Sequence, residues 1–498
     1  MEFRWGRYFD RDCPATRTRT RTSRGLGQAL ETAGPMKGLF GLYQRVHLVG
    51  IGGAGMEGLA RFLGQLGCRV SGSDQAASPV LEELAQEGFA VYQGHRAAGV
   101  KDTDLVVYSA AVPADNCERQ AALRAGIPQV GRAEVVGELS RSYFTIAVAG
   151  SHGKTTTSAM IGRILTCAGL EPGCLIGGRT AGQVLAGCGG GRYLVVEADE
   201  YMRGFHYLHP RAALVTSVDP EHLDCYGDQA GVEEAFLRFI GQVPFYGTTL
   251  MGVDNDGVER IRPQVQGACC TYGVDVPAEF AAGQIETQAW GSRFELSCRG
   301  ESLGPVEVGV PGRHNIANAL GAAALTRSLG VDLGAIRRGL QTFAGVERRY
   351  QRKGEVDGVL VVDDYAHHPA EIEATLATAR QAQRRVVAVF QPHLYSRTQA
   401  LCDQFARALQ GADQVFVAGV YAAREEPHQG SQGDAIVAAL RQQGYSAVSY
   451  VPHLADMTGQ VLEACGGGEV VLTIGAGNIG QIADGLIGAL KARRVGKR

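Results

Sequence analysis

The segment that decides the fold is AVAGSHGKTTTSAM, residues 147–160. An apolar run at 144–148 precedes it and predicts a β-strand, and apolar residues at helical spacing follow it and predict a helix that ends near Gly169. The glycine loop GSHGKT, Gly150–Thr155, lies between them. Strand, glycine loop and helix together form a phosphate cradle, because N–H groups of the loop and first helical turn face the anion and the helix dipole favours negative charge there.

Two side chains of this loop carry the predicted chemistry. In a phosphate loop the Lys154 amine reaches the outer phosphates of a nucleotide, and the Thr155 hydroxyl binds Mg²⁺. The loop is shorter than the full G-x-x-x-x-G-K-[ST] pattern, which requires glycine where Val148 stands. The alternative interpretation is a plain glycine turn before a helix, but the strand, the helix and the Lys-Thr pair together favour a nucleotide site.

Length and composition limit the classes of protein to which the chain can belong. A chain of 498 residues is too long for one core and predicts roughly three domains. Apolar residues at 45% and charged residues at 20% are typical of a soluble globular protein. A net charge of −3 gives no case for nucleic-acid binding, and no apolar run is long enough for a membrane helix. The 12 cysteines show no paired zinc spacing and indicate free thiols in a reducing compartment.

The N-terminal segment differs from the rest of the chain. The first 35 residues contain seven arginines, almost no apolar periodicity and no apolar core of a signal peptide. We expect residues 1–36 to be a disordered extension or a mis-assigned start, with Met36 as the candidate true start. An arginine-rich targeting peptide is the alternative, and the acidic residues of the segment weigh against it.

A second glycine loop follows the first apolar strand. In GIGGAGM, Gly50, Gly52 and Gly55 satisfy G-x-G-x-x-G, a helix follows, and the next strand ends at Asp74, about 20 residues past the loop. This is a Rossmann-like βαβ unit, and we expect it to close near Leu139. A further G-x-G-x-x-G follows the last predicted strand, so this motif alone does not establish a dinucleotide site.

The strand pattern predicts an α/β protein of three domains. We expect a Rossmann-like domain at 37–139, a central P-loop ATPase-like domain with a mostly parallel sheet at 140–346, and a Rossmann-like C-terminal domain at 347–498. Between Gly252 and Val310 short segments with turns predict an antiparallel insertion.

Polar side chains follow several predicted strands. Glu197, in EADE, stands at the end of one strand beside the phosphate loop, where a carboxylate is placed to bind Mg²⁺, and the alternative is an acidic surface turn. His222, in DPEHLD, follows the next strand and is a candidate second ligand, although a lone loop histidine is usually solvated. In GRHNIANA, His314 and Asn318 have polar edges that suit a nucleotide base, and Asn315 reads as a helix N-cap.

Two more polar clusters follow strands of the C-terminal region. DDYAHHPAE at 363–371 and QPHLYSRT at 391–398 each crowd His and Tyr at a strand end, and the second adds Arg397. We expect these two strand ends to be adjacent, which would place a site in the crevice of an open sheet. The alternative for either segment alone is a capped loop.

Taken together, these segments resemble the Mur ligase family, and within it the alanine-adding branch. The matching segments occur in the family's order over roughly residue 46 to the C-terminus: GIGGAGM, VSGSD, YSAAVP, GSHGKTTT, EADE, DPEHLD, GRHNIANA, FAGVERR, DDYAHHPAE, QPHLYSRT and GAGNIG. The resemblance implies three domains, for UDP-sugar, ATP and amino acid. It also implies that the first glycine loop cradles the UDP diphosphate and binds no nicotinamide.

The resemblance implies a role for each matching position. The catalytic residues implied are Lys154, Glu197, His222, His367 and Arg397. The ATP-binding residues are Gly150, Ser151, His152, Gly153, Lys154, Thr155, Thr156, His314, Asn318, Arg348 and Asp363. The UDP-sugar contacts are Gly52, Gly53, Ala54, Gly55, Ser73, Asp74, His95 and Ser109. Tyr365, His367 and Arg397 face the amino acid, and Thr155, Glu197 and His222 hold the metal.

Two departures from the family pattern bear on the branch. Several sister ligases carry a carbamylated lysine after the D-H-x-D segment, and here residues 233–247 contain no lysine, which agrees with the alanine-adding branch. Some alanine-adding members have a basic residue where Leu394 stands, so Arg397 would do more of the binding of the amino acid here.

The implied reaction joins L-alanine to UDP-N-acetylmuramate with ATP and Mg²⁺ (two ions), through an acyl phosphate, in peptidoglycan precursor synthesis in a bacterial-type cytoplasm. His367 is the candidate base for the amine. The alternatives are a related ligase that adds a preformed peptide to the same UDP-sugar, an NAD-dependent oxidoreductase suggested by the glycine loops, and a nucleotide-gated binding protein without chemistry. We expect a monomer or homodimer with small-molecule substrates, without nucleic-acid or membrane partners.

Overall fold

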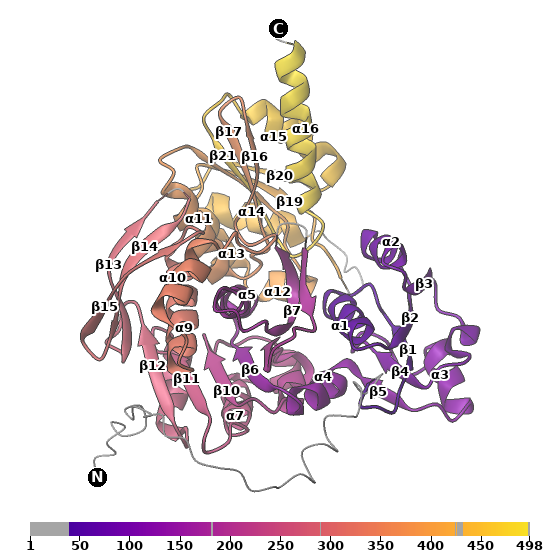
Figure 1. Ribbon diagram of the computed structural model, residues 1–498. Coiled ribbons are helices and arrows are strands. Elements are labelled where there is room, and N and C mark those ends of the chain that lie inside the picture. The colour runs from indigo at the N-terminus through magenta and orange to yellow at the C-terminus, as the bar shows by residue number, and fades with distance from the viewer. Residues whose placement is uncertain (1–38, 181–182, 289, 424, 426–431, 497–498) are drawn as a thin grey trace, which may run out of the picture.

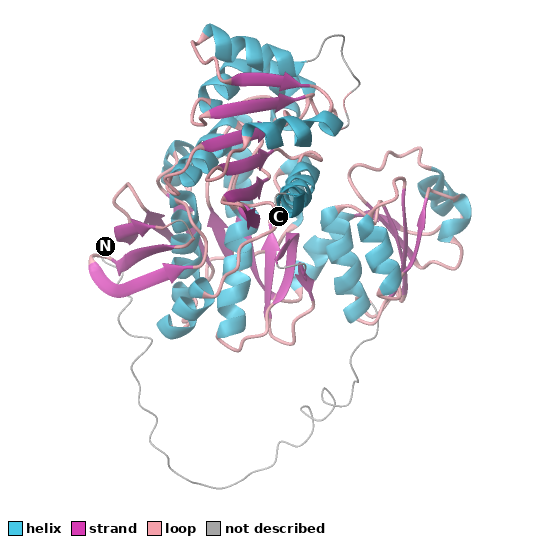
Figure 2. Ribbon diagram, turned by 90° about the horizontal axis from the view of Figure 1, so that it is seen from above, coloured by secondary structure: helices cyan, strands magenta, loops and turns pink. Residues whose placement is uncertain are grey.

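The computed structural model describes residues 39–496, except 181–182, 289, 424 and 426–431. In this part of the chain the strands form three sheets, of five, ten and six strands, with helices packed on them. Figure 1 shows the N-terminal sheet to the right, the central sheet to the lower left and the C-terminal sheet above, and Figure 2 shows the same three parts from above. The predicted α/β class with three sheet-based parts is confirmed.

The N-terminal sheet has the order β3-β2-β1-β4-β5 and is parallel throughout. Such a sheet binds ligands where the strand order reverses, here between β1 and β4. The predicted glycine loop follows β1 and enters α1, so it lies at this position. The elements are β1 (Arg45–Val49), α1 (Ala54–Gln65), β2 (Arg69–Asp74), α2 (Pro79–Gln86), β3 (Ala90–Gln93), η1 (Ala97–Val100), β4 (Leu105–Tyr108), α3 (Cys117–Arg124), β5 (Gln129–Gly131) and α4 (Arg132–Arg141).

The central sheet places the phosphate loop at its middle. β6 lies between β10 and β9, parallel to both, and runs into the loop and α5. The first elements are β6 (Phe144–Ala149), α5 (Lys154–Cys167), β7 (Gly173–Thr180), β8 (Gln183–Gly187), β9 (Tyr193–Glu197), η2 (Tyr201–Tyr207), β10 (Ala212–Val215), α6 (Leu223–Tyr226), α7 (Gln229–Ile240) and β11 (Thr248–Gly252). The remainder are α8 (Asp256–Ile261), η3 (Arg262–Gln264), β12 (Cys269–Gly273), β13 (Phe280–Thr287), β14 (Ser292–Cys298), β15 (Glu301–Val308), α9 (Arg313–Ser328) and α10 (Leu333–Gln341).

The C-terminal sheet has the order β16-β17-β21-β18-β19-β20, and only β16 among its described strands runs antiparallel to its neighbour. β21 separates β17 from β18, so the two polar strand ends that we expected to be adjacent are one strand apart. The elements are β16 (Gln351–Val356), β17 (Val359–Asp364), α11 (Pro369–Arg380), β18 (Val386–Phe390), α12 (Tyr395–Ala400), α13 (Cys402–Leu409), β19 (Gln414–Ala418), α14 (Gln432–Gln442), β20 (Val448–Val451), α15 (Leu454–Ala464), β21 (Val470–Ile474) and α16 (Gly480–Gly496).

Successive side chains of β6 are buried on opposite faces of the central sheet. Ile146 and Val148 are fully buried in one apolar cluster with α5, α9 and α10. Ala147 and Ala149 point to the other face, into a cluster that continues through Phe62 into the N-terminal part. A strand buried on both faces is expected at the centre of a parallel sheet. The core therefore fixes both the strand before the phosphate loop and the helix after it.

The prediction of an antiparallel insertion between Gly252 and Val310 is only partly right. β11, β12 and β13 are parallel neighbours, and antiparallel pairing begins with β13 and β14. These strands also extend the central sheet rather than forming a separate insertion. The short segments alternate with turns in either arrangement, so their pattern did not distinguish the direction of pairing.

The expected domain boundaries stay predictions. The three sheets fall within the expected ranges, while α4 spans the expected boundary at 139 and connects the first two sheets. The expected N-terminal extension lies outside the described residues. Within the residues described, no helix is both long and apolar enough to cross a membrane.

Candidate active site

The phosphate loop adopts a conformation that requires glycine at two positions. Gly150 has φ 143°, and a Cβ there would lie 1.9 Å from the Thr216 hydroxyl oxygen. Gly153 has φ 80°, and its Cβ would lie 2.5 Å from the Asn318 amide oxygen. Side chains other than hydrogen do not fit such close approaches. The loop is thus pressed between the strand β10 and the helix α9, with the N–H groups at the start of α5 lacking intrahelical acceptors.

Lys154 lies partly buried at the start of α5. Its Nζ donates to the Gly150 carbonyl at 2.6 Å and to the Glu200 carboxylate at 2.9 Å. Glu200 is only 2% exposed, and burial raises the pKa of Glu200 to about 7, against the opposing effect of Lys154. The Glu200 carboxylate holds the amine at the mouth of the loop. Glu200 was not among the predicted site residues, although it belongs to the EADE segment.

The three residues predicted to hold the metal line one small cavity. The Thr155 hydroxyl donates to Glu197 at 2.7 Å, and Nε2 of His222 lies 3.7 Å from the Glu200 carboxylate. All of them line a cavity of about 100 Å³ together with Lys154 and His367. Carboxylate and hydroxyl oxygens are ligands that Mg²⁺ prefers. Burial lowers the pKa of His222, which keeps the imidazole neutral, as a metal ligand must be. The residues therefore fit a Mg²⁺ ion.

A larger cavity of about 300 Å³ lies on the other side of the phosphate loop. The predicted ATP residues that line it are His152, Gly153, Thr156, His314 and Asn318. Other lining residues were not predicted from the sequence: Asn255, Tyr272, Arg349, Asp364 and Glu371. The cavity is walled by the central part on one side and by α11 and the end of β17 on the other, which is where a nucleotide bound to the loop would lie.

Arg348 and Asp363 do not line this cavity, although both were predicted to bind ATP. They pair with each other, with Arg348 Nε 3.3 Å from the Asp363 carboxylate, and Arg348 also donates to the Gly475 carbonyl at 2.6 Å. Their neighbours Arg349 and Asp364 line the cavity instead. The roles of Arg348 and Asp363 in ATP binding stay predictions, and the geometry places the ion pair inside the C-terminal part.

Helix α9 begins three residues earlier than the predicted N-cap at Asn315 implies. Gly312 is its N-cap, so Asn315 lies within the first turn and donates to the Pro311 carbonyl at 2.7 Å. The Asn318 amide oxygen accepts from the Thr157 hydroxyl at 3.2 Å. Asn318 thereby links α9 to α5 directly behind the phosphate loop.

Replacing His314 with glutamine tests whether the imidazole that lines the larger cavity is neutral. Burial, with a smaller effect of Arg349, lowers the pKa of His314 to about 4, whereas the unfolded imidazole titrates near 6.5. The unfolded chain therefore binds more protons between these values, and His314 lowers stability as pH falls from about 6.5 to 4. We expect the melting temperature of His314→Gln to fall less than that of the parent between pH 7 and 4.5. Equal falls in both proteins would contradict a buried neutral His314.

Of the three residues predicted to face the amino acid, only His367 lines the small cavity. His367 Nδ1 lies 3.1 Å from the Tyr365 carbonyl and 3.3 Å from the Glu371 carboxylate. Arg397 lies 3.3 Å from the carboxylate of Glu221, on the central part. Burial lowers the pKa of His367 to about 4, which makes its imidazole neutral but a weak base.

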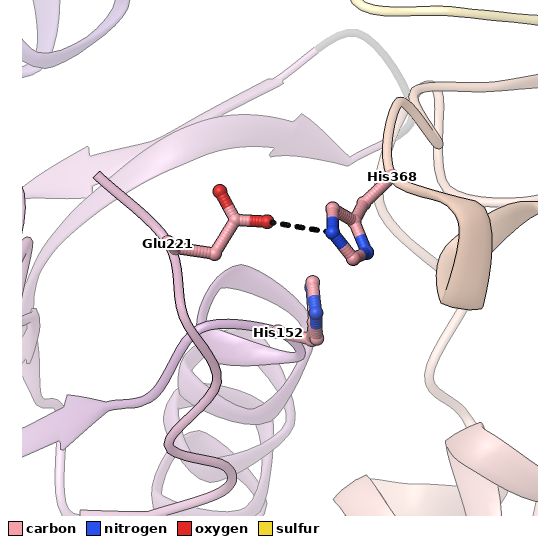
Figure 3. A group of neighbouring side chains, drawn as sticks. All are labelled: His152, Glu221 and His368. Atoms are coloured by element: carbon pink, nitrogen blue, oxygen red, sulfur yellow. Dashed lines mark ion pairs between the residues drawn. The ribbon is translucent and has the colours of Figure 1, made fainter. Parts of the chain in front are cut away.

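A cluster of two imidazoles and one carboxylate joins the central and C-terminal parts. In Figure 3, His152 comes from the phosphate loop, Glu221 from the loop after β10, and His368 from the segment before α11. One ligand atom from each lies within 4.8 Å of the others. Nδ1 of His152 also lies 3.1 Å from Glu371. Nitrogen-rich sets suit transition metals better than Mg²⁺, so this cluster fits Mg²⁺ less well than the residues around Thr155 do.

The predicted UDP-sugar residues gather at the other glycine loop. The Gly52 amide donates to the Asp74 carboxylate at 2.9 Å, and a Cβ on Gly50 would lie 3.1 Å from Ser109 Cβ. Gly53, Ala54 and Gly55 form the start of α1. Ser73 faces inward: its hydroxyl is fully buried, donates to Glu118 at 2.5 Å and lies 2.9 Å from His95. A contact from Ser73 to a nucleoside stays a prediction.

The structure thus brings the predicted residues together in two groups. One group surrounds the N-terminal glycine loop, and the other surrounds the phosphate loop, between the central and C-terminal parts. Ion pairs connect the two parts that carry these groups: Arg179 of β7 contacts Glu57 of α1 at 2.8 Å and Glu83 of α2 at 2.6 Å. This arrangement defines a class of protein. It is an α/β enzyme in which one part activates a substrate with a nucleoside triphosphate and another part holds the remote end of that substrate.

Family models match the chain along most of its length. Residues 45–144 match the Mur ligase family catalytic domain, residues 148–326 the Mur ligase middle domain, and residues 348–477 the Mur ligase glutamate ligase domain. The chain belongs to the Mur ligase family. The first glycine loop lies inside a matched region, so the resemblance seen in the sequence is confirmed and the oxidoreductase alternative is set aside.

Similar proteins cover nearly the whole chain. The UDP-N-acetylmuramate–L-alanine ligase of Salinibacter ruber is 44% identical over 91% of this chain and 96% of the relative. That of Syntrophobacter fumaroxidans is 41% identical over 91% and 98%. The crystal structure of the UDP-N-acetylmuramate–alanine ligase of Thermotoga maritima matches with a TM-score of 0.79 and 28% identity, over 90% and 99% of the two chains. A murein peptide ligase of Psychrobacter arcticus matches with a TM-score of 0.66 and 27% identity, over 89% and 98%.

Proposed function

We propose that the chain joins L-alanine to UDP-N-acetylmuramate with ATP and Mg²⁺, giving UDP-N-acetylmuramoyl-L-alanine, ADP and phosphate. The observation that carries the proposal is the small cavity that gathers Lys154, Thr155, Glu197, His222 and His367. It lies beside a phosphate loop in a chain 44% identical, over 91% of its length, to an alanine-adding ligase. The work belongs to peptidoglycan precursor synthesis, and we place it in the cytoplasm, where nucleotide-activated precursors and ATP meet.

The reaction must activate a poor acyl donor. A carboxylate has no good leaving group, so one of its oxygens attacks the γ-phosphorus of ATP, ADP leaves, and an acyl phosphate forms. The amine of alanine then attacks the acyl carbon, phosphate leaves, and the amide forms. The protein's contribution to such transfers is mostly positioning and neutralisation of charge.

Each residue of the small cavity has a task in this scheme. Lys154 neutralises the γ-phosphate, which requires the amine to exchange Glu200 for the incoming anion. Thr155, Glu197 and His222 would hold Mg²⁺, whose charge would offset the repulsion between the γ-phosphate and the carboxylate. The larger cavity receives the adenosine, with His314 and Asn318 at the base.

Alanine enters from the C-terminal part. Arg397 and Tyr365 bind and orient it, and Leu394 offers no charge where some members have one. His367 touches the same space but is a weak base, since burial lowers its pKa to about 4. The amine must lose its proton to attack, and Glu221 and Glu371, which face this space, are weak bases as well, because despite burial the neighbouring arginine and histidine side chains lower the pKa of both carboxyls.

Phosphate release with each amino acid in turn tests the proposal. With ATP, Mg²⁺ and UDP-N-acetylmuramate, we expect release with L-alanine and little with the other protein amino acids. Release with a tripeptide but not with alanine would assign the chain to the peptide-adding ligases. If no amino acid or peptide gives phosphate release, the proposal is contradicted. Oligomeric state, monomer or homodimer, stays a prediction.

A further inference from the structure

Three metal-ligating side chains meet between the central and C-terminal parts, apart from the set that fits Mg²⁺. They are the imidazoles of His152 and His368 and the carboxylate of Glu221, and Figure 3 shows them facing one space from three separate segments. One ligand atom from each lies within 4.8 Å of the other two. Two of the residues belong to loops of the central part, and His368 belongs to the segment before α11.

Glu221 has one carboxylate oxygen that no hydrogen bond uses. Its Oε2 lies 3.3 Å from Arg397 Nη2, whereas its Oε1 is buried without a hydrogen-bond partner and lies 3.8 Å from His368 Nε2. Nδ1 of His368 is likewise buried without a hydrogen bond. Buried polar atoms that stay unpaired cost free energy and call for a partner. A metal ion between the two side chains would use the free lone pair of Glu221 Oε1.

His152 has the carboxylate partner that orients metal-binding histidines. Its Nδ1 lies 3.1 Å from the Glu371 carboxylate, a contact that favours a proton on Nδ1. A carboxylate on one ring nitrogen fixes the tautomer and leaves a lone pair for a metal on the other nitrogen. That other nitrogen, Nε2, lies 3.6 Å from Asp219 Oδ2, so Asp219 is the nearest further oxygen ligand on this side.

The geometry and the chemistry of the three ligands suit zinc. Zinc binds imidazole nitrogen and carboxylate oxygen at about 2.0–2.2 Å, and tetrahedral ligands at such distances lie roughly 3.4 Å from one another. The three ligand atoms therefore have to approach one another by at most about 1.4 Å. The side chains of His152 and His368 are 25% and 19% exposed, so an ion reaches them without unfolding of the chain.

We propose that His152, Glu221 and His368 form a binding site for one zinc ion, which ties the phosphate loop to the segment before α11. The site is separate from the Mg²⁺ ligands around Thr155, and the proposal does not depend on the identity of the reaction. Because its ligands come from both the central and the C-terminal part, the bound ion holds these two parts together. Binding to the folded chain alone then raises the melting temperature.

The test measures Zn²⁺ binding to the whole chain in excess Mg²⁺ by equilibrium dialysis, for the parent, His368→Gln and Glu221→Gln. We expect each substitution to raise the dissociation constant of Zn²⁺ roughly 100-fold or more, because losing even an outer partner of a ligand costs about 10- to 100-fold. Zn²⁺ should raise the melting temperature of the parent and of neither variant. The melting transition without Zn²⁺ reports whether each variant is folded.

Two exposed residues supply matched controls. His453→Gln lies at the start of α15 in the C-terminal part, and Glu286→Gln lies on β13 in the central part. Both variants should bind Zn²⁺ as the parent does. Glu371→Gln keeps all three ligands and removes only the partner of His152 Nδ1, so its dissociation constant should rise about 10- to 100-fold. This variant keeps the proposal testable if a ligand variant does not fold.

Cobalt distinguishes this site from the cysteines, of which the chain has 12. Co²⁺ bound by imidazole and carboxylate gives weak visible bands without the intense near-ultraviolet band of a thiolate ligand, and we expect this spectrum for the parent. A thiolate band would overturn the proposal. So would a parent that binds no Zn²⁺ in excess Mg²⁺, or affinity that survives in folded His368→Gln. His222→Gln should keep parental affinity, and a loss there with none in His368→Gln would assign the zinc to the Mg²⁺ ligands instead.

Discussion

Lys154→Ala is expected to lower kcat by roughly 10³-fold or more while the fold survives, because the amine neutralises the phosphate that is transferred. In the ligand-free protein the amine is held by Glu200 at 2.9 Å, within reach of the loop carbonyls. Steady-state phosphate release with L-alanine measures the loss. Circular dichroism and the melting transition report the fold. Near-parental turnover in Lys154→Ala would contradict the assignment of the loop.

The variant also leaves Glu200 without its cation, so its stability needs a control. Burial already raises the pKa of Glu200 to about 7, and loss of Lys154 favours the neutral acid further. We expect Lys154→Ala with Glu200→Gln to restore the melting temperature but not the turnover. Lys353→Ala is the matched lysine control, because Lys353 pairs with Asp484 at 2.8 Å in the C-terminal part. It should retain parental kcat.

Glu197→Gln is expected to lower kcat about 10²- to 10³-fold and to raise the Mg²⁺ concentration that gives half-maximal rate. Glu197 accepts from the Thr155 hydroxyl at 2.7 Å and from the Gly177 amide at 2.8 Å. The amide side chain keeps the shape but loses the charge that binds the metal. Rates measured across a Mg²⁺ titration, at saturating ATP, report both effects.

An exposed glutamate supplies the control for this substitution. Glu286→Gln, on β13, should leave the rate and the Mg²⁺ dependence unchanged. A Glu197→Gln enzyme with normal Mg²⁺ dependence would show that Glu197 only braces Thr155. In that case the metal site would have to be sought among the other acids of the cavity.

Local patterns predicted the parts of the site that lie on one segment. The phosphate loop, its strand and its helix follow each other in the sequence, so spacing and apolar periodicity were sufficient. The first sheet was predictable for the same reason. Glu200, Arg349 and Asp364 were missed because their roles depend on which segments meet in three dimensions. Arg349 and Asp364 each follow directly after a residue that was predicted, Arg348 and Asp363.

Two elements show where the pattern failed. The hairpin of β7 and β8 has glycine-rich strands with low intrinsic strand preference. It forms because it packs on α1 and because Glu197 accepts from the Gly177 amide. The pairing direction of β11 to β13 likewise depends on neighbours in space, which short apolar segments do not encode.

The most direct test of the account follows oxygen from the substrate to the phosphate. UDP-N-acetylmuramate labelled with ¹⁸O in its carboxylate is turned over with ATP and L-alanine, and the phosphate is examined by mass spectrometry. We predict one ¹⁸O per phosphate released, because the carboxylate oxygen that attacks the γ-phosphorus leaves with it. Phosphate without label, at the same rate of product formation, would contradict activation of the carboxylate by phosphorylation at this loop.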